Sequence, residues 1–382
     1  MRTSYELPFK LFGIPVKLNI SFLIFFPLLA WLIGSQLDYY VGLLGMNIDT
    51  TALTTGPMPL LVGLIAAAGL FLGVTLHELG HSFVARSYGV QIKSITLHVL
   101  GGVAELEQIP PESGREAKMA ISGPLVSFLL GAIARAFFVL LSPTNPLPKF
   151  ITGYMMYVNF AVGAFNLIPA LPLDGGRVLR SLLASRQSRF RATQTATKIS
   201  RGIAVFMGII GILNLQIFLV LIAVYVYIGA SSEIRNMMVH QALDGLKAKD
   251  LMTEDVITVA PDTTIQEMME IMMERRHLGY PVLDNKEEVV GIVTLADLKE
   301  SEDKRDLVRD VMTSQVVTIK EYDGAEEAFT RITQNNLGRL IVVDDTKSMV
   351  GIITRTDIMN ALKIATSGPL EEQPKEFLEH SD

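Results

Sequence analysis

The chain contains no cysteine among its 382 residues. This absence excludes disulfides, a zinc site built from thiolates and a thiol nucleophile. Acidic residues are scarce in the first part, where residues 1–239 contain 17 Lys and Arg but only 10 Asp and Glu. Residues 240–382 contain 16 Lys and Arg and 29 Asp and Glu. The formal net charge of −6 is therefore the sum of a basic first part and an acidic second part. An acidic soluble part argues against nucleic acid as a partner.

Long apolar runs dominate the first part, and charged residues are almost absent from them. A helix needs about 20 apolar residues to cross a lipid bilayer. The last run is long enough for two short helices that meet near residues 214–216, so we expect a hairpin there and about six spans in all. The runs lie at residues 18–37, 60–88, 117–141, 150–168 and 203–230.

Basic residues indicate which ends of the runs face the cytoplasm, because Lys and Arg are enriched on that side. They cluster before the first run, between the second and third runs, and densely from 177 to 201. This pattern places the N-terminus inside. A hairpin at 203–230 returns the acidic part to the same side, whereas a single span would place it outside. We predict an integral protein of the cell membrane with its N-terminus and acidic part in the cytoplasm.

Residues 90–110 interrupt the helical pattern between the second and third runs. Val90, Ile92, Ile95, Leu97 and Val99 alternate in part with polar residues, which is typical of strands. Backbone beside membrane spans must be paired or must face a water-filled cavity. We therefore expect a short membrane-associated β-hairpin.

The second apolar run contains the sequence HELGH at residues 77–81. On a helix, His77 and His81 lie on one face, so their imidazoles can bind one ion. A catalytic zinc keeps a position for water and lowers the pKa of that water. Glu78 lies beside the histidines and can accept the proton. Such a motif is often chance in a soluble protein, but polar groups inside an apolar helix are costly and functional by default.

The third zinc ligand must come from elsewhere in the membrane part. Asp174 is the best candidate, in the segment NLIPALPLDGG at the inner end of the fourth run. Two prolines break the helix there and two glycines relax the backbone, so the carboxylate can turn into the helix bundle. We predict one zinc ion per chain, bound by His77, His81 and Asp174.

These motifs resemble the site-2 protease family of intramembrane zinc metalloproteases. The resemblance rests on HELGH in a membrane helix, followed by N-x-x-P-x-x-P-L-D-G from Asn166, and it covers about residues 1–235. It implies hydrolysis of a peptide bond in or near a transmembrane helix of a membrane-protein substrate. It also implies that Glu78 is the general base and that Asn166 helps to bind substrate or to stabilise the oxyanion.

The acidic part contains an internal repeat. DLMT at 250–253 matches DVMT at 310–313, and GIVTLADL from Gly291 matches GIITRTDI from Gly351. In the first copy we expect a strand at 256–259, a helix at 264–276, strands at 280–283 and 289–294, and then a helix. In each copy a strand ends at a threonine that begins a helix, with an acid three residues later: Thr294 with Asp297, and Thr354 with Asp357.

Each threonine–aspartate pair fits either a helix cap or the ligand signature of cystathionine-β-synthase-type (CBS) domains. Two copies in the same frame are typical of a CBS pair. The resemblance implies that the threonine contacts phosphate and the aspartate contacts ribose of an adenine nucleotide (ATP, ADP or AMP). The alternative is that the pair serves only as a dimerisation module, joining two copies of the chain.

The predicted fold is a polytopic α-helical membrane domain with a short β-hairpin, followed by a soluble α/β tandem CBS pair. We expect a protease domain at 1–235, a linker at 236–246, CBS domains at 247–303 and 304–366, and a disordered acidic tail at 367–382. One rival hypothesis is a CBS-gated transporter or channel, which has no need of Glu78 beside His77 and His81. Another is a membrane scaffold with a structural zinc, which would need four protein ligands where the sequence offers three.

Overall fold

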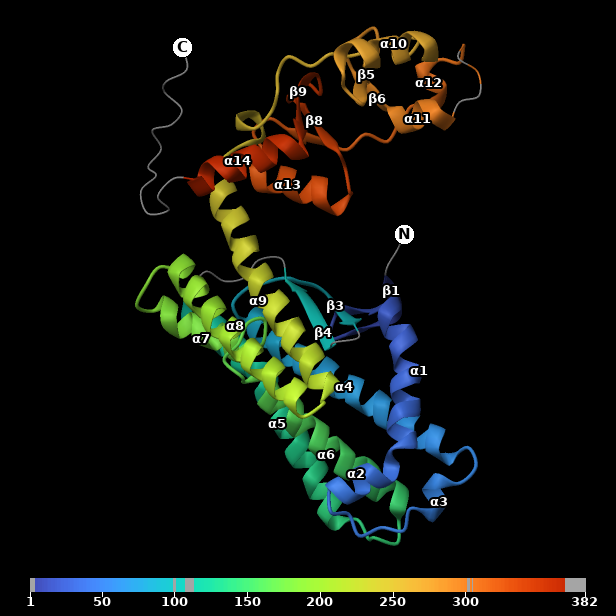
Figure 1. Ribbon diagram of the computed structural model, residues 1–382, viewed down its shortest axis with the longest axis vertical. Helices are drawn as coiled ribbons and strands as arrows, with labels where there is room; N and C mark the ends of the chain where they lie inside the picture. Colours follow the sequence, from blue (N-terminus) through green and yellow to red (C-terminus); the bar gives the residue numbers. More distant parts are fainter. Residues whose placement is uncertain (1–3, 99–100, 107–112, 301–302, 304, 368–382) are drawn as a thin grey trace. The chain divides into compact units, whose positions relative to one another are not determined.

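The computed structural model describes residues 4–98, 101–106, 113–300, 303 and 305–367, and the chain divides into two units, Met1–Ile234 and Arg235–Asp382 (Figure 1). Long helices and one sheet build the first unit, and two smaller sheets with helices build the second. This arrangement confirms the predicted fold class. The helices that begin in the first unit are α1 (Ile20–Ser35), α2 (Leu37–Leu43), α3 (Thr51–Thr54), α4 (Met58–Ser87), α5 (Ser113–Leu140), α6 (Pro146–Asn166), α7 (Asp174–Ala184), α8 (Arg189–Leu213) and α9 (Ile217–Leu243).

Four helices of the described ranges are long and apolar enough to cross a membrane: α4, α5, α8 and α9. Helices α1 and α2 together add a fifth candidate, which is bent by 65°. Helix α6 falls outside this set because Lys149, Asn159 and Asn166 lower its mean hydropathy. By length and composition, the described residues therefore contain four or five candidate spans, against about six in the sequence prediction. The break between α8 and α9 does fall at residues 214–216, as expected for the hairpin.

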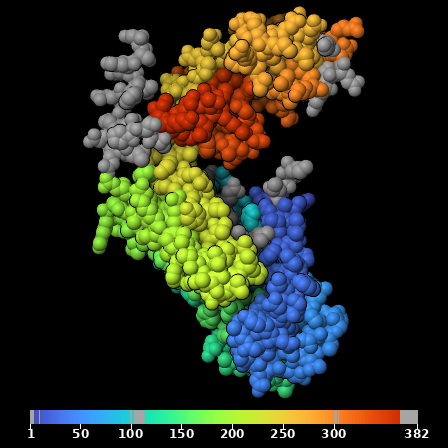
Figure 2. All heavy atoms as spheres, viewed as in Figure 1, coloured from blue at the N-terminus to red at the C-terminus, as the bar shows by residue number. Residues whose placement is uncertain are grey.

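The hairpin of α8 and α9, lime to yellow in Figure 2, exposes many large apolar side chains. Phe206 is 65% exposed, Leu215 is 92% exposed and Phe218 is 67% exposed. Soluble proteins rarely expose contiguous apolar patches of this kind. Such a surface suits the hydrocarbon of a bilayer, where a helix satisfies its own backbone groups.

The first unit contains one sheet, with its strands in the order β1-β2-β3-β4. Strands β3 and β4 form the predicted hairpin. The sequence prediction missed β1 and β2, a second antiparallel hairpin whose inner strand pairs with β3 in parallel, with Val16 opposite Ile95. Ile14 and Ile95 are fully buried in a cluster with Phe71 and Leu79 of α4, so the sheet packs directly on the helix that carries HELGH. The strands are β1 (Ser4–Leu11), β2 (Ile14–Asn19), β3 (Ile92–His98) and β4 (Gly101–Leu106).

The second unit consists of two similar copies, each with its own hydrophobic core. In the first copy, Met268 and Tyr280 are buried between helix and sheet, and in the second copy Ala328 and Leu340 occupy the equivalent places. The first copy comprises η1 (Ala248–Asp250), α10 (Ile265–Arg275), β5 (Gly279–Leu283), β6 (Val289–Thr294) and α11 (Leu295–Glu300). The second comprises α12 (Val308–Val311), β7 (Thr318–Lys320), α13 (Ala325–Gln334), β8 (Arg339–Val343), β9 (Met349–Thr354) and α14 (Arg355–Ser367).

The two copies exchange their first segments. Thr253 of the first copy pairs with Ile352 of the second, and Thr313 of the second pairs with Ile292 of the first. Both contacts consist of two backbone hydrogen bonds of 2.9–3.1 Å. Because the two pairings are equivalent under the repeat, the copies are related by an internal pseudo-twofold and form one folded body.

The strand expected at 256–259 is absent from the structure. Val256 donates to the carbonyl of Glu254, and this tight turn follows the exchanged residue Thr253. Only Val259 pairs with the sheet, as an isolated bridge to Val282. The second copy makes the same exchange through Thr313 and still forms β7, so the first copy differs by the tight turn at 254–256. The expected tail at 367–382 lies, apart from Ser367, outside the described residues.

Candidate metal centre

Helix α4 places the two histidines of HELGH deep in the first unit. His77 is 3% exposed and His81 is 8% exposed. The helix continues through this region because its sequence is apolar and unbroken, with proline in the first turn and Gly89, at positive φ, just beyond the end. The four-residue spacing puts both imidazoles on one face of α4, as the sequence predicts.

The two imidazoles and the carboxylate of Asp174 converge on one point. His77 Nε2 lies 3.1 Å from Asp174 Oδ2, and His81 Nε2 lies 3.2 Å from the same oxygen. The two Nε2 atoms lie 3.2 Å apart. Two ligands at about 2.0–2.1 Å from a tetrahedral zinc ion stand roughly 3.3 Å apart. The three donor atoms therefore have the chemistry and nearly the spacing of a zinc site.

The hydrogen bonds on the far sides of the imidazoles determine which ring nitrogen faces this point. His81 Nδ1 lies 2.7 Å from the carbonyl oxygen of Met119, which can only accept, so Nδ1 carries the proton. His77 Nδ1 lies 2.8 Å from the hydroxyl of Ser127, which can accept in the same way. In the neutral rings both Nε2 atoms then present lone pairs to the carboxylate. Three electron-rich atoms this close repel one another unless a cation lies among them.

Gly123 of α5 leaves open the space beside these atoms. A Cβ at this position would lie 2.3 Å from His81 Nε2 and 2.6 Å from His77 Nε2. These distances are shorter than the contact distance of any carbon and nitrogen, so an alanine would collide with the ligand atoms themselves. Position 123 must therefore be glycine if the nitrogens are to bind an ion.

Glu78 lies beside the triangle formed by His77 Nε2, His81 Nε2 and Asp174 Oδ2, but it is not one of its three corners. Its carboxylate lies within 4.8 Å of a ring nitrogen of both histidines, whereas Asp174 Oδ2 lies 3.1 and 3.2 Å from them. The shorter distances favour Asp174 as the third ligand and leave Glu78 available to act on a water. The β3–β4 hairpin contacts this side chain, because a Cβ on Gly102 would lie 2.6 Å from Glu78 Cγ.

Asp174 reaches the site because the chain turns sharply between α6 and α7. The two prolines of the segment prevent the helix from continuing through the turn. The backbone amide of Leu171 donates to Ser200 Oγ of α8 at 2.7 Å, which fixes the turn. A Cβ on Gly176 would lie 2.2 Å from the amide nitrogen of Leu171, so glycine permits α7 to start this close. Asp174 becomes the first residue of α7, with its carboxylate directed into the bundle.

Asn166 ends α6 and does not join the triangle of ligand atoms. Its amide donates to the carbonyl oxygen of Val162 in its own helix at 3.0 Å. Its role in substrate binding stays a prediction.

The sequence reasoning missed three groups of α5 that touch the histidines: Met119, Gly123 and Ser127. They recur at spacings of four residues and so lie on one face of the helix. Small polar residues at helical spacing within an apolar run, as in SGPLVS at 122–127, were the available signal.

The threonine–aspartate pairs of the second unit form helix caps in both copies. Thr294 donates through its amide and its hydroxyl to Asp297 Oδ2, both at 2.7 Å. Thr354 donates to Asp357 Oδ2 at 2.8 and 2.7 Å. The capping interpretation therefore describes both sites, and one oxygen of each aspartate is engaged by the cap.

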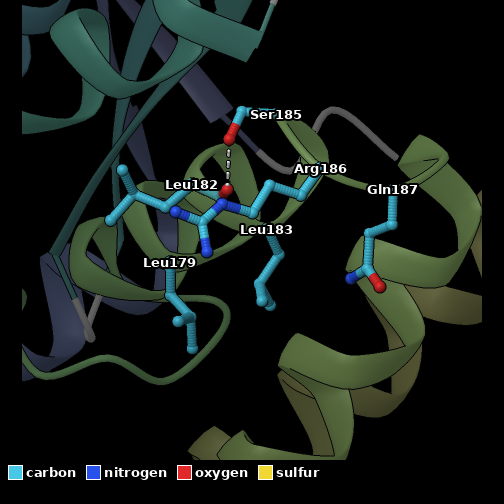
Figure 3. A pocket seen from close by; sticks show the side chains of 6 residues that line it. All are labelled: Leu179, Leu182, Leu183, Ser185, Arg186 and Gln187. Carbon is cyan, nitrogen blue, oxygen red and sulfur yellow. Dashed lines mark hydrogen bonds between the residues drawn. The ribbon is translucent and has the colours of Figure 1, made fainter.

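A pocket of about 470 Å³ lies at the carboxyl end of α7 (Figure 3). Leu179, Leu182, Leu183, Ser185, Arg186 and Gln187 line it. The hydroxyl of Ser185 is occupied by a hydrogen bond to the carbonyl of Leu182. The described lining of the pocket contains neither a carboxylate nor an imidazole, so the pocket has none of the donor groups found around His77, His81 and Asp174.

Comparison with known proteins places this triangle in a family. Residues 65–153 and 148–210 match the family model of peptidase family M50, and residues 248–303 and 308–364 match the model of the CBS domain. A zinc metalloprotease of Methanocaldococcus jannaschii is 36% identical over 361 residues, which cover 93% of this chain and 95% of the relative. A Synechocystis sp. protein named as a candidate zinc metalloprotease is 28% identical over 376 residues, covering 94% and 95%.

The chain belongs to peptidase family M50, the site-2 protease family. A solved site-2 protease of Methanocaldococcus jannaschii is 34% identical and covers 60% of this chain and 95% of its own, with a TM-score of 0.41. The two family models and the Methanocaldococcus jannaschii relative show that the chain is a membrane-embedded metalloprotease with a CBS pair. Both full-length relatives named here carry metalloprotease names, which gives the transporter hypothesis no support.

Proposed function

We propose that this site-2 protease family member hydrolyses a peptide bond in or near a transmembrane helix of a membrane-protein substrate. Its zinc ion would be held by His77, His81 and Asp174. The observation that carries the proposal is the triangle of donor atoms 3.1–3.2 Å apart, next to a glycine whose Cβ would fill it. With three protein ligands, such a site keeps a position for water, as catalytic zinc sites do.

Each side chain of the site has a distinct task. A zinc ion bound here supplies Lewis acidity, which lowers the pKa of a water and polarises a carbonyl. Glu78 accepts the proton of the attacking water and passes it to the nitrogen of the cleaved amide, which then leaves as an amine. Ser127 and the Met119 carbonyl hold the two imidazoles with Nε2 toward Asp174, and the carbonyl also fixes the tautomer of His81.

The substrate must reach this site as an extended strand. His77 lies ten residues before the end of α4, or roughly 15 Å along the helix axis. A peptide bond in a helix is hydrogen-bonded and shielded, so the substrate has to unwind locally. Among the described strands, β4 has a partner on one side only, and Gly102 of this strand contacts Glu78. We infer that the unwound segment pairs with β4 by strand addition.

Asn166 is the proposed substrate-binding residue at the end of α6. Its amide now donates to the carbonyl of Val162. Binding of a substrate carbonyl or of the oxyanion would require the amide to exchange this acceptor. The loss on Asn166→Ala should therefore appear in kcat/KM, with zinc content unchanged.

The CBS pair is the proposed regulatory part of the protein. Thr294 with Asp297 and Thr354 with Asp357 are the expected contacts to ATP, ADP or AMP, and the orientation inferred from basic residues places them in the cytoplasm at the cell membrane. Helix α9 passes without a break from the first unit to Leu243. A ligand shifts a conformational balance only by its differential affinity for the two states, which is typically 1–3 kcal/mol, or about 5–150-fold.

Glu78→Gln tests the proposed chemistry. The amide keeps the shape of the side chain but cannot accept a proton at neutral pH. Purified variant should therefore hold one zinc per chain and cleave a transmembrane reporter orders of magnitude more slowly than wild type. Glu6→Gln, the same change at an exposed residue of β1, should leave the rate unchanged. Cleavage by Glu78→Gln at the wild-type rate would exclude the mechanism.

A further inference from the structure

A buried ion cluster joins four helices, α5, α7, α8 and α9, outside the groups that the chemistry uses. Arg180 of α7 is only 2% exposed. Its Nε donates to Oε1 of Glu116 on α5 at 3.0 Å, and its Nη1 donates to Oε1 of Glu233 on α9 at 2.5 Å. Arg189 of α8 lies 3.7 Å from the other oxygen of Glu116. Such a cluster resists change, because removal of one partner leaves a buried charge uncompensated.

Two helices of this cluster also build the metal centre. Helix α7 begins at Asp174 and carries Arg180 six residues later, roughly 9 Å along the axis. On α5, Glu116 lies on the same face as Met119 and Ser127, the two groups that bond to the histidines. The Arg180–Glu116 contact therefore holds the helix of the carboxylate ligand against the face that orients the two imidazoles.

Helix α9, which carries Glu233 of the cluster, extends beyond the first unit. Helix α9 carries Glu233 and ends at Leu243, and the first CBS match begins at residue 248. The side chain of Glu233 is 31% exposed, whereas those of Arg180 and Glu116 are each 3% exposed. Water can solvate Glu233 more easily than its partners, so a shift of α9 would change the Arg180–Glu233 contact before the Arg180–Glu116 contact.

We propose that Arg180 is a positioning residue of the metal centre. Through Glu116 it sets the distance from Asp174 to the histidines of α4, and through Glu233 it makes this distance depend on α9. The triangle is sensitive to such a shift because its ligands come from two separate helices, and its donor atoms lie only 3.1–3.2 Å apart. The inference rests on the proposed zinc site.

Zinc affinity of the full-length protein tests the proposal, measured by competition with a chelator in detergent. Arg180→Met should weaken zinc binding by about 10- to 100-fold, the range for partners that orient metal ligands. Arg180→Lys should recover part of the loss, since an ammonium keeps the charge but cannot form the fork between two carboxylates. Glu233→Gln removes only the more exposed charge, so it should fold like wild type and weaken zinc binding by a smaller factor.

Lys149→Met is the matched control for loss of a buried cation. Lys149 of α6 donates to the carbonyls of Phe138 and Leu141 at 2.5 and 2.9 Å, near the other end of α5. This contact lies roughly 33 Å along the helix from Glu116. Lys149→Met should lower the Tm, as Arg180→Met should, but leave zinc affinity unchanged.

The outcomes separate the positioning role from the zinc site itself. Equal losses of zinc affinity in Arg180→Met and Lys149→Met would show a general structural effect and overturn the proposal. Wild-type affinity in both Arg180→Met and Glu233→Gln would also overturn it while leaving the proposed function intact. A wild-type protein that binds no zinc would overturn the proposed function and the positioning role together.

Discussion

The metal centre and the CBS motifs differ in what satisfies their polar side chains. In the CBS copies, each aspartate accepts two hydrogen bonds from the threonine three residues before it. In the metal centre, two imidazole nitrogens and a carboxylate oxygen face one another, and their protein partners lie behind the rings. The CBS pairs are therefore complete as local structure, whereas the triangle is incomplete without a cation.

This difference decides how strongly each site indicates function. A helix cap stabilises a fold whether or not a ligand binds, so its residues fit a structural role equally well. Buried polar groups among apolar helices have no such local explanation, and each is costly until it is bound. Substitutions that affect the metal centre should therefore affect function first, and those that affect the CBS caps should affect stability first.

Gly123→Ala should have the largest effect of all. The added methyl would lie 2.3 and 2.6 Å from the two Nε2 atoms and would occupy the space of the ion. Zinc content should fall to near zero by elemental analysis, and reporter cleavage should fall with it.

Gly114→Ala provides the matched control in the same helix. Apart from the adjacent residues and the backbone of its own helix, no described atom lies within 4 Å of a Cβ at this position. The variant should keep its zinc and its activity. Full zinc occupancy in Gly123→Ala would mean that the ion lies somewhere other than among these nitrogens.

The sequence predicted the parts of the metal centre that lie close together in the chain. His77, Glu78 and His81 belong to one helical turn, so spacing alone determines their geometry. Asp174 was found because prolines and glycines mark an unusual break beside a membrane helix. Gly123 and Ser127 were missed because their role depends on how α5 packs against α4, and packing between helices leaves little trace in one sequence.

Contacts between distant parts of the chain also explain where the predicted strands were wrong. Strands β1 and β2 lie far in sequence from β3, and their residues alternate only weakly, so nothing local indicated that Val16 pairs with Ile95. The strand expected at 256–259 has the right composition, but a tight turn from Glu254 to Val256 leaves only Val259 paired with the sheet. Helix periodicity is local and was predictable, whereas strand pairing depends on distant partners.

Ser127→Ala should have an intermediate effect and would sharpen the comparison. The hydroxyl bonds to His77 Nδ1 at 2.8 Å and so holds the ring with Nε2 toward the ion. Its loss should weaken zinc binding by about 10- to 100-fold, measured by chelator competition.

Thr152→Val removes a hydroxyl that bonds only to carbonyls of its own helix, α6, and serves as the control for Ser127→Ala. It should bind zinc like wild type. If Ser127→Ala binds zinc equally well, the imidazole is held by its packing and not by this hydrogen bond.

The smallest effect should come from the CBS caps, where Asp297→Ala and Asp357→Ala remove one cap each. Each should cost about 0.5–2 kcal/mol of stability, because the amide and hydroxyl of the capping threonine lose their acceptor. Glu267→Ala is the matched control in α10. Its carboxylate accepts hydrogen bonds from the amide and the hydroxyl of Thr264, as each aspartate does from its own threonine. These bonds hold the pKa of Glu267 below its usual value.

Thermal unfolding of the full-length protein with AMP or ATP distinguishes a cap from a ligand site. A nucleotide at 100 times its Kd stabilises the folded state by about 2.7 kcal/mol. If the aspartates bind ribose, wild type and Glu267→Ala should both gain this stability, and the double variant Asp297→Ala with Asp357→Ala should gain none. If millimolar nucleotide fails to raise the Tm of wild type, both aspartates act as caps alone. Dimerisation would then be the better account of the CBS pair, and its aspartates would differ from the metal ligands in having a structural role alone.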